Sequence, residues 1–146
     1  MTIENPSDAA LSTERVIAAS PAAIFAAFAR PETLAAWWGP DGFTNTFDLF
    51  EFRNDGRWVY TMHGPNGANY QNESVFRVIE PDRRIVIDHV VAPRFTLTIT
   101  LTPQAERTHL SWVQEFENAE TAAKIRAFIG DANEQNLNRL EAVLKH

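Results

Sequence analysis

The last part of the chain, from about Ala119 to Leu144, is the feature that most restricts the possible folds. Its apolar residues recur at steps of three and four, which is the spacing of one face of an α-helix. These residues are Ile125, Phe128, Ile129, Ala132, Leu137, Leu140, Val143 and Leu144. The charged side chains between them are expected to form the solvated face. They are Lys124, Asp131, Glu134, Arg139 and Glu141. A helix of this length, about 39 Å at the usual rise per residue, needs a long apolar surface to cover.

Six segments before this helix show the alternation of apolar and polar residues that is typical of half-buried strands. They cover residues 43–52, 56–63, 73–80, 83–91, 94–102 and 108–116. Turn-forming residues separate them, among them Asn54-Asp55-Gly56 and Gly64-Pro65-Asn66-Gly67. A further alternating segment, residues 11–19, precedes Ser20-Pro21, an N-cap followed by a proline at the first helical position. The sequence therefore predicts six or seven strands.

Two short helices are expected directly after the first strand. One begins at Pro21, and the next begins at Pro31 and ends before Gly39-Pro40. Because the strands are concentrated in the middle and no strand–helix unit repeats, the pattern favours an antiparallel α+β sheet over a parallel one. We expect a curved antiparallel sheet of six or seven strands around the long C-terminal helix.

Length and composition limit the class of protein. The chain of 146 residues is 45 % hydrophobic, which is enough for the core of one domain, so residues 11–146 are expected to form a single domain after a flexible segment at residues 1–10. A net charge of −6 argues against a nucleic-acid partner and against a polybasic membrane anchor. The sequence has no secretory signal and no run of about 18 apolar residues, so we expect no membrane partner and a cytoplasmic location.

Motifs for metal, cofactor or nucleophilic chemistry are missing from the sequence. No histidine pair has metal-ligand spacing, and with no cysteine the chain offers no thiolate. Asp88 and His89 are neighbours on an expected strand and so point to opposite faces. No Gly-x-Ser-x-Gly elbow occurs. We therefore expect no metal and no cofactor, and we assign no catalytic residue.

The aromatic residues are more informative. Trp58, Tyr60 and Met62 share one face of their strand, and Trp112 and Gln114 share one face of the last strand, so both sets are expected to point inward. Packing alone would explain them. The polar atoms of Tyr60, Trp112 and Gln114, however, need partners when buried, and apolar walls with a few convergent polar groups are typical of ligand pockets. The predicted ligand-binding residues are Trp38, Trp58, Tyr60, Trp112, Gln114, Phe128, Ala132 and Asn136.

The adjacent tryptophans Trp37 and Trp38 come just before Gly39-Pro40. We expect Trp37 to anchor the second short helix in the core. Trp38 is expected at the rim of the pocket, although a core position would also fit it.

Several motifs in this order resemble one known family. They are Glu14-Arg15 in the first strand, the Ser20-Pro21 helix start, "PETLAAWWGP", "GRW", "GPNG", "SVFRVIEPDRRIV" and "NLNRLEAVL". From about Leu11 to its end, the chain resembles the AHSA family, the homologues of the heat-shock chaperone ATPase activator, within the START-like (SRPBCC) helix-grip superfamily. The resemblance implies a cavity between the curved sheet and the long helix, and a link to the stress response.

Three functions stay open at this point, because one fold hosts many activities. The first is a binding domain for an apolar, aromatic or lipid-like small molecule held in the cavity. The second is an interaction with a heat-shock chaperone, which the resemblance implies. The third is a cyclase- or hydrolase-type enzyme, with Tyr60, His63, His89 or Glu115 as acid or base.

Overall fold

The computed structural model describes residues 9–145, and these form seven strands and three helices. In chain order the elements are β1 (Ala10–Ile17), α1 (Pro21–Ala29), α2 (Pro31–Trp37), β2 (Thr44–Phe50), β3 (Gly56–His63), β4 (Asn69–Glu80), β5 (Arg84–His89), β6 (Phe95–Gln104), β7 (Arg107–Phe116) and α3 (Ala119–Leu144). The expected order of elements is confirmed, including the two short helices and the long C-terminal helix.

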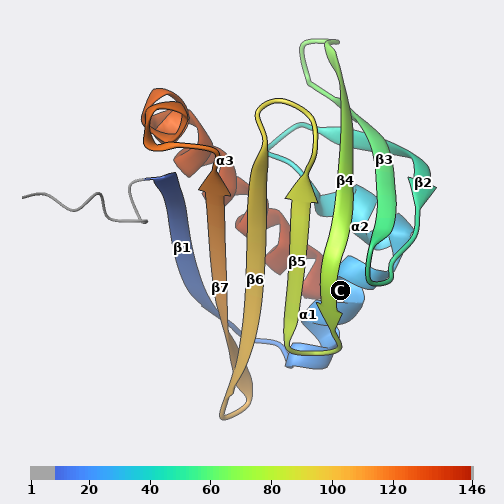
Figure 1. The fold of residues 1–146 in the computed structure, drawn as a ribbon. Coiled ribbons are helices and arrows are strands. Elements are labelled where there is room, and N and C mark those ends of the chain that lie inside the picture. The colour runs from blue at the N-terminus through green and yellow to red at the C-terminus, as the bar shows by residue number, and fades with distance from the viewer. Residues whose placement is uncertain (1–8, 146) are drawn as a thin grey trace, which may run out of the picture.

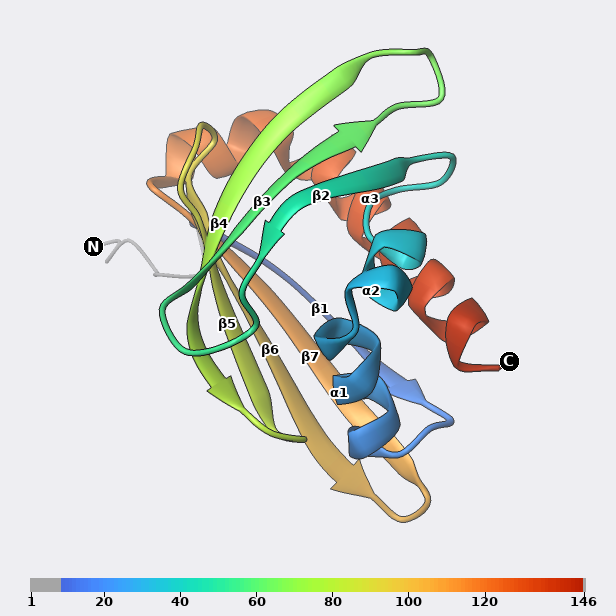
Figure 2. The same ribbon diagram turned by 90° about the vertical axis from the view of Figure 1, so that its right-hand side faces the viewer.

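All seven strands belong to one antiparallel sheet in the order β1-β7-β6-β5-β4-β3-β2. Strands β2 to β7 form a meander, and β1 closes the far edge by pairing with β7, where Thr13 lies opposite Trp112. The two short helices carry the chain from β1 at one edge to β2 at the other (Figure 1). Figure 2 shows that the sheet curves and that all three helices lie on its concave side.

The helix starts follow from local sequence. The Ser20 side chain accepts a hydrogen bond of 3.1 Å from the Ala23 amide, and Pro21 takes the first helical position. Asn118 caps α3 in the same way, by accepting a hydrogen bond of 2.8 Å from the Thr121 amide. Both caps satisfy amides that would otherwise have no partner in the helix.

The turn into β3 requires glycine for lack of space. A Cβ atom on Gly56 would lie 1.9 Å from the carbonyl oxygen of Glu51. No side chain fits at that distance, so the glycine at the start of "GRW" lets the backbone of the preceding loop pass directly beside β3.

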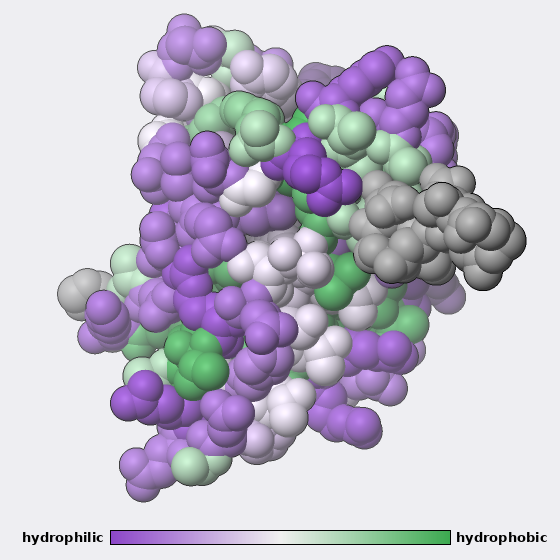
Figure 3. All heavy atoms as spheres, turned by 90° about the vertical axis from the view of Figure 1, so that its left-hand side faces the viewer, coloured by the Kyte–Doolittle hydropathy of each residue, from purple (hydrophilic) through white to green (hydrophobic). Residues whose placement is uncertain are grey.

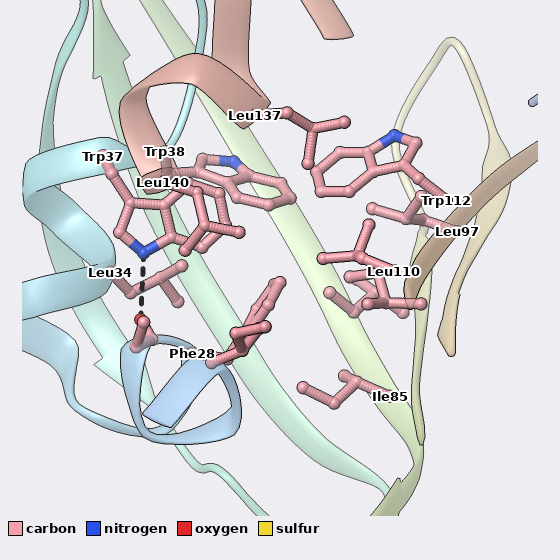
Figure 4. Close-up of a cluster of buried hydrophobic side chains, with 14 of the residues drawn as sticks. Phe28, Leu34, Trp37, Trp38, Ile85, Leu97, Leu110, Trp112, Leu137 and Leu140 are labelled. Carbon is pink, nitrogen blue, oxygen red and sulfur yellow. Dashed lines mark hydrogen bonds between the residues drawn. The ribbon is translucent and has the colours of Figure 1, made fainter. Parts of the chain in front are cut away.

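The main core lies between the sheet and the three helices (Figure 4). Alternation places Ile85, Leu97 and Leu110 on the concave face, where each is almost fully buried. Leu137 and Leu140 of α3 close this core from the helix side. A smaller cluster, Leu11 with Phe116 and Ala122, seals the end where α3 begins.

Few large hydrophobic side chains are exposed among the described residues. On the β1 side of the molecule, hydrophobic residues are separated from one another by hydrophilic ones (Figure 3). Among the described residues, the large hydrophobic side chains that remain exposed are Val16, Tyr70 and Phe128. In the part of the chain that the structure describes, no helix is long and apolar enough to cross a membrane. The expected flexible segment at residues 1–10 falls largely outside the described residues, and Ala10 already pairs in β1.

Candidate functional site

A hollow of about 220 Å³, which we call the central cavity, lies between the concave face of the sheet and α3. Strands β3, β6 and β7 supply its apolar wall, and residues 38–40 supply its edge next to α2. Its lining consists of Trp38, Gly39, Pro40, Tyr60, Met62, Asn72, His89, Pro93, Phe95, Leu97, Trp112, Gln114, Ile129, Ala132, Asn133 and Asn136.

Six of the eight predicted site residues line this cavity, namely Trp38, Tyr60, Trp112, Gln114, Ala132 and Asn136. They come from β3, β7, α3 and the loop after α2, and the side-chain period of the strands brings the inward residues together. Trp38 and Trp112 approach one another from opposite sides beneath Leu137 (Figure 4), with their ring centroids 5.9 Å apart. That these residues contact a ligand stays a prediction.

Two predicted site residues lie elsewhere. Trp58 is fully buried behind the cavity wall, stacked on Tyr60 with 4.1 Å between ring centroids. Phe128 is 70 % exposed, so the expectation that it faces the sheet is wrong. The buried face of α3 is centred between Asn136 and Leu137, and at 100° per residue Phe128 lies about 130° from that centre.

Trp37 and Trp38 have different roles. Trp37 is fully buried, and its indole Nε1 donates a hydrogen bond of 3.0 Å to the Ala27 carbonyl, which ties α2 to α1 (Figure 4). Trp38 is 7 % exposed and lies against both Trp58 and Trp112, so its ring forms part of the cavity wall.

Two residues that line the cavity, His89 and Asn72, were not among the predicted ligand-binding residues, and His89 was considered only as an acid or base. The sequence does indicate that His89 points inward, because it alternates with the buried residues Ile85 and Ile87 on β5. Asn72 lies on an early part of β4 that has no apolar alternation, and the predicted strand began only at residue 73. Tertiary pairing with β3, which sets Asn72 opposite Tyr60, extends β4 over this polar segment.

Uncharged polar groups occupy two parts of the cavity. Near β7, Asn133 Nδ2 donates a hydrogen bond of 3.0 Å to Gln114 Oε1. Near β5, His89 Nε2 lies 2.7 Å from Asn72 Oδ1, and His89 Nδ1 lies 2.9 Å from the Pro93 carbonyl oxygen. The indole Nε1 of Trp112 is buried without a hydrogen-bond partner among the described residues. A buried donor of this kind gains when a ligand supplies an acceptor.

Burial controls the protonation of the titratable groups in the cavity. It raises the pKa of Tyr60 to about 12, so the phenol keeps its proton. Burial also lowers the pKa of His89 below its ordinary value. No Asp, Glu, Lys or Arg is among the described residues that line the cavity. Its interior is therefore uncharged at neutral pH.

The lowered pKa of His89 leads to a testable prediction about how stability depends on pH. The unfolded chain protonates this histidine near its ordinary pKa of about 6.5, whereas the folded protein does so only at lower pH, so the unfolding free energy should decrease as the pH falls from about 7.5 to 5.5. Urea unfolding at several pH values measures this slope, and His89→Gln should reduce it. An NMR titration with a His89 midpoint at or above 6.5 would contradict the prediction.

Residues 38–43, which we call the α2–β2 loop, are held against α3 by three side chains of that helix. Asn136 Oδ1 accepts a hydrogen bond of 3.2 Å from the Gly39 amide, and Gln135 Oε1 accepts one of 3.0 Å from the Asp41 amide. The guanidinium of Arg139 donates to five backbone carbonyls, at distances between 2.8 and 3.3 Å. These carbonyls belong to Ala36, Trp38, Gly39, Pro40 and Phe43.

Three charged residues that were expected on the solvated face of the last helix differ in their surroundings. Placing Arg139 on the solvated face of the helix was wrong, because hydropathy period alone cannot show that a half-buried guanidinium meets a turn of backbone carbonyls. Glu134 and Glu141 do lie at the surface edge of α3, where both pair with Arg15 of β1 at 2.6 and 2.7 Å. Those pairs join α3 to the edge of the sheet.

The four residues considered as acid or base do not meet in one place. Tyr60 and His89 line the cavity. His63 lies at the end of β3 with its ring nitrogens near Thr46 and Asn69, and Glu115 lies exposed on the other face of β7. Asp88 likewise points outward, where it pairs with Arg77 at 2.6 Å. Among the described residues, no group of three or more histidine or acidic side chains is arranged to hold a metal ion.

Comparison with known proteins is consistent with this architecture. The family model described as "Activator of Hsp90 ATPase homolog 1-like protein" matches residues 18–145. No curated protein matches the sequence.

Solved structures of bacterial proteins share the fold. A protein from Arthrobacter aurescens has a TM-score of 0.87 at 23 % identity, covering 98 % of this chain and 90 % of its own. A protein from Nitrosomonas europaea also reaches 0.87, at 18 % identity, covering 95 % and 96 %. The AHSA1 protein from Silicibacter pomeroyi has a TM-score of 0.75 at 22 % identity, covering 94 % and 100 %.

Proposed function

The chain belongs to the family of activator of Hsp90 ATPase homolog 1-like proteins, which have the START-like helix-grip fold, and from this premise we propose that it binds an apolar small molecule in the central cavity. The observation that carries the proposal is the buried indole of Trp112, which lines the cavity and has no hydrogen-bond partner among the described residues. The Trp58 indole nitrogen is also buried without a partner among the described residues, but Trp58 does not line the cavity, so the lining position of Trp112 is what connects its free donor to a ligand.

The chemical composition of the cavity wall also supports the binding of an apolar small molecule. Trp38, Trp112 and Phe95 offer aromatic surface, and only a few amides interrupt it. Apolar walls supply affinity through burial, while a small number of polar groups set the orientation of the ligand. The clamped α2–β2 loop keeps Trp38 and Gly39 in place, so this part of the wall is formed before any ligand arrives.

The NMR signals of the tryptophan indole N–H groups test the proposed binding. Trp37, which does not line the cavity, serves as an internal control. On addition of para-diisopropylbenzene, an apolar aromatic probe, the indole N–H signals of Trp38 and Trp112 should shift. The signal of Trp37, which is bonded to Ala27 outside the cavity, should stay in place. Native mass spectrometry of freshly purified protein would show a retained natural ligand. If no indole signal moves at any probe concentration, the cavity does not bind apolar molecules.

A second candidate function is contact with a heat-shock chaperone, which the relation of the family to the activator of Hsp90 ATPase suggests. The specific observation in its favour is Phe128, a large apolar side chain that is 70 % exposed on α3. Pull-down with an Hsp90 chaperone tests it. Phe128→Ser should abolish capture if this surface is used, whereas Trp112→Phe inside the cavity should leave capture unchanged. Absence of capture by the unaltered protein would eliminate this candidate.

A further inference from the structure

The volume of the central cavity restricts the size of a ligand. An apolar protein cavity of about 150 Å³ accommodates one benzene ring with space to spare, so a hollow of about 220 Å³ suits a compact molecule of roughly nine to twelve non-hydrogen atoms. A long acyl chain has more atoms than this space holds. The ligand is therefore expected to be compact, with one ring or two fused rings.

The polar groups of the cavity lie at two separated places. Gln114 and Asn133 are on β7 and α3, whereas Asn72 and His89 are on β4 and β5. Strand β6 lies between β5 and β7, and its contribution to the cavity is apolar, namely Phe95 and Leu97. From β7 to β4 there are three strand spacings, about 14 Å along the sheet and less across its concave side.

Free hydrogen-bonding capacity remains at the end near β7. Gln114 uses its Oε1 atom to accept from Asn133, and Asn136 uses its Oδ1 atom to accept from Gly39. In the part of the chain that the structure describes, neither Gln114 Nε2 nor Asn136 Nδ2 donates a hydrogen bond to protein. Together with Trp112 Nε1, these groups offer donors to a ligand from one side.

Charge is absent from the cavity lining, as the described residues show. A charged ligand group would have to leave water without a counter-charge, which is far more costly than burying a neutral group that forms hydrogen bonds. The nearby carboxylate of Asp88 points outward to Arg77 and Thr96, and the Arg139 guanidinium is directed to backbone carbonyls. Neither group balances a charge inside.

From these observations we infer that the ligand is a compact, uncharged aromatic molecule with a hydrogen-bonding group at each end of an apolar ring. The inference rests on the proposed function and narrows it. One polar end lies at Gln114 and Asn136 with the Trp112 indole. The other lies at the Asn72 amide, which donates one N–H to the Tyr70 carbonyl and keeps the second, because both ring nitrogens of His89 already lie beside Asn72 Oδ1 and the Pro93 carbonyl. The ring lies on Phe95 and Leu97 between them.

Three probes of similar shape separate polarity from charge, and a fourth probe tests size. Terephthalamide carries a neutral amide at each end of a benzene ring, terephthalate carries a carboxylate at each end, and para-diisopropylbenzene has the same shape without polar groups. Terephthalamide should bind about tenfold more tightly than para-diisopropylbenzene, since it adds hydrogen bonds at both ends. Terephthalate should bind at least about tenfold more weakly than terephthalamide. Palmitate, as a long-chain probe, should not shift the Trp112 indole signal.

A matched pair of variants locates the polar end. Gln114→Leu should remove most of the advantage of terephthalamide over para-diisopropylbenzene. Gln71→Leu, the same change on an exposed position of β4, should leave the advantage unchanged. If Gln114→Leu does not fold, Asn133→Leu removes the same amide pair from the helix side. Calorimetry gives the affinities, and the Trp112 indole signal and side-chain amide signals report where each probe binds.

The possible outcomes separate a failure of this inference from a failure of the proposed function. Terephthalate binding as tightly as terephthalamide, or palmitate shifting the cavity signals, would overturn the inference while leaving the cavity a binding site. Equal affinity for terephthalamide and para-diisopropylbenzene would do the same. If none of the four probes shifts the Trp112 indole, both the inference and the proposed function fail.

Discussion

Trp58→Ala is expected to lower the unfolding free energy by about 3–5 kcal/mol, the range found for large aromatic residues truncated in a core. The Trp58 side chain is fully buried, and its ring lies between Tyr60 and Phe76 with centroid distances of 4.1 and 5.6 Å. Trp38 meets the same indole edge-on at 5.2 Å. No single neighbour can fill the space that the indole leaves, so a cavity term adds to the lost burial.

Urea unfolding followed by circular dichroism measures this loss without depending on tryptophan fluorescence. Phe128→Ala is the matched control, because this aromatic side chain is 70 % exposed and should change stability by no more than about 0.5 kcal/mol. A loss below about 1 kcal/mol for Trp58→Ala would show that the ring is not part of a packed core. A loss of several kcal/mol for Phe128→Ala would mean that its side chain is covered in solution.

The fold could be predicted from the sequence because its elements differ in period. The alternation of Phe95, Leu97 and Ile99 with threonines has period two, and the apolar residues of α3 have the helical period. The turn residues between the strands left a meander as the simplest connection. The expected helix and the observed α3 have the same bounds, so the helical period of the apolar residues was sufficient to predict this element.

The site was harder to predict than the fold, for two physical reasons. Phe128 fits the helical pattern at sequence level, but the face of a helix that becomes buried depends on what it packs against, which the period does not specify. Trp58 and Trp112 both point inward, and only the three-dimensional packing shows that Trp58 is covered by Tyr60 and Phe76 while Trp112 adjoins a hollow.

Arg139 illustrates a contact that no local pattern predicts. Its partners are backbone carbonyls nearly a hundred residues away, and a carbonyl leaves no trace in the sequence. Gln135 and Asn136, one turn before it, bind amides of the same loop. In this way α3 satisfies both donors and acceptors of a loop whose backbone forms no regular structure, as buried polar groups require.

Arg139→Met should lower the unfolding free energy by about 3 kcal/mol. A hydrogen bond to a charged group contributes roughly 1.5–3 kcal/mol, and partial exposure of the guanidinium limits the sum over the five carbonyl contacts to about the value of one strong bond of this kind. Burial lowers the pKa of Arg139, yet an arginine stays charged at any pH the protein tolerates. Methionine keeps the apolar stem of the side chain, so the loss reports the guanidinium itself.

Two further variants show whether the geometry of the guanidinium is what matters. Arg139→Lys keeps the charge but cannot reach several carbonyls at once, so its stability should lie between that of Arg139→Met and the unaltered protein. Arg15→Met removes an arginine that pairs with Glu134 and Glu141 near the surface, and should cost about 1 kcal/mol or less.

Hydrogen exchange tests the loop directly, because the amides of Gly39 and Asp41 are bonded to α3 side chains. In Arg139→Met these two amides should exchange much faster, while the amides of the β6–β7 pair keep their protection. Since Trp38 and Gly39 also line the central cavity, affinity for para-diisopropylbenzene should fall together with loop protection. Unchanged exchange at Gly39 and Asp41, with stability within about 0.5 kcal/mol of the unaltered protein, would show that Arg139 does not hold the loop.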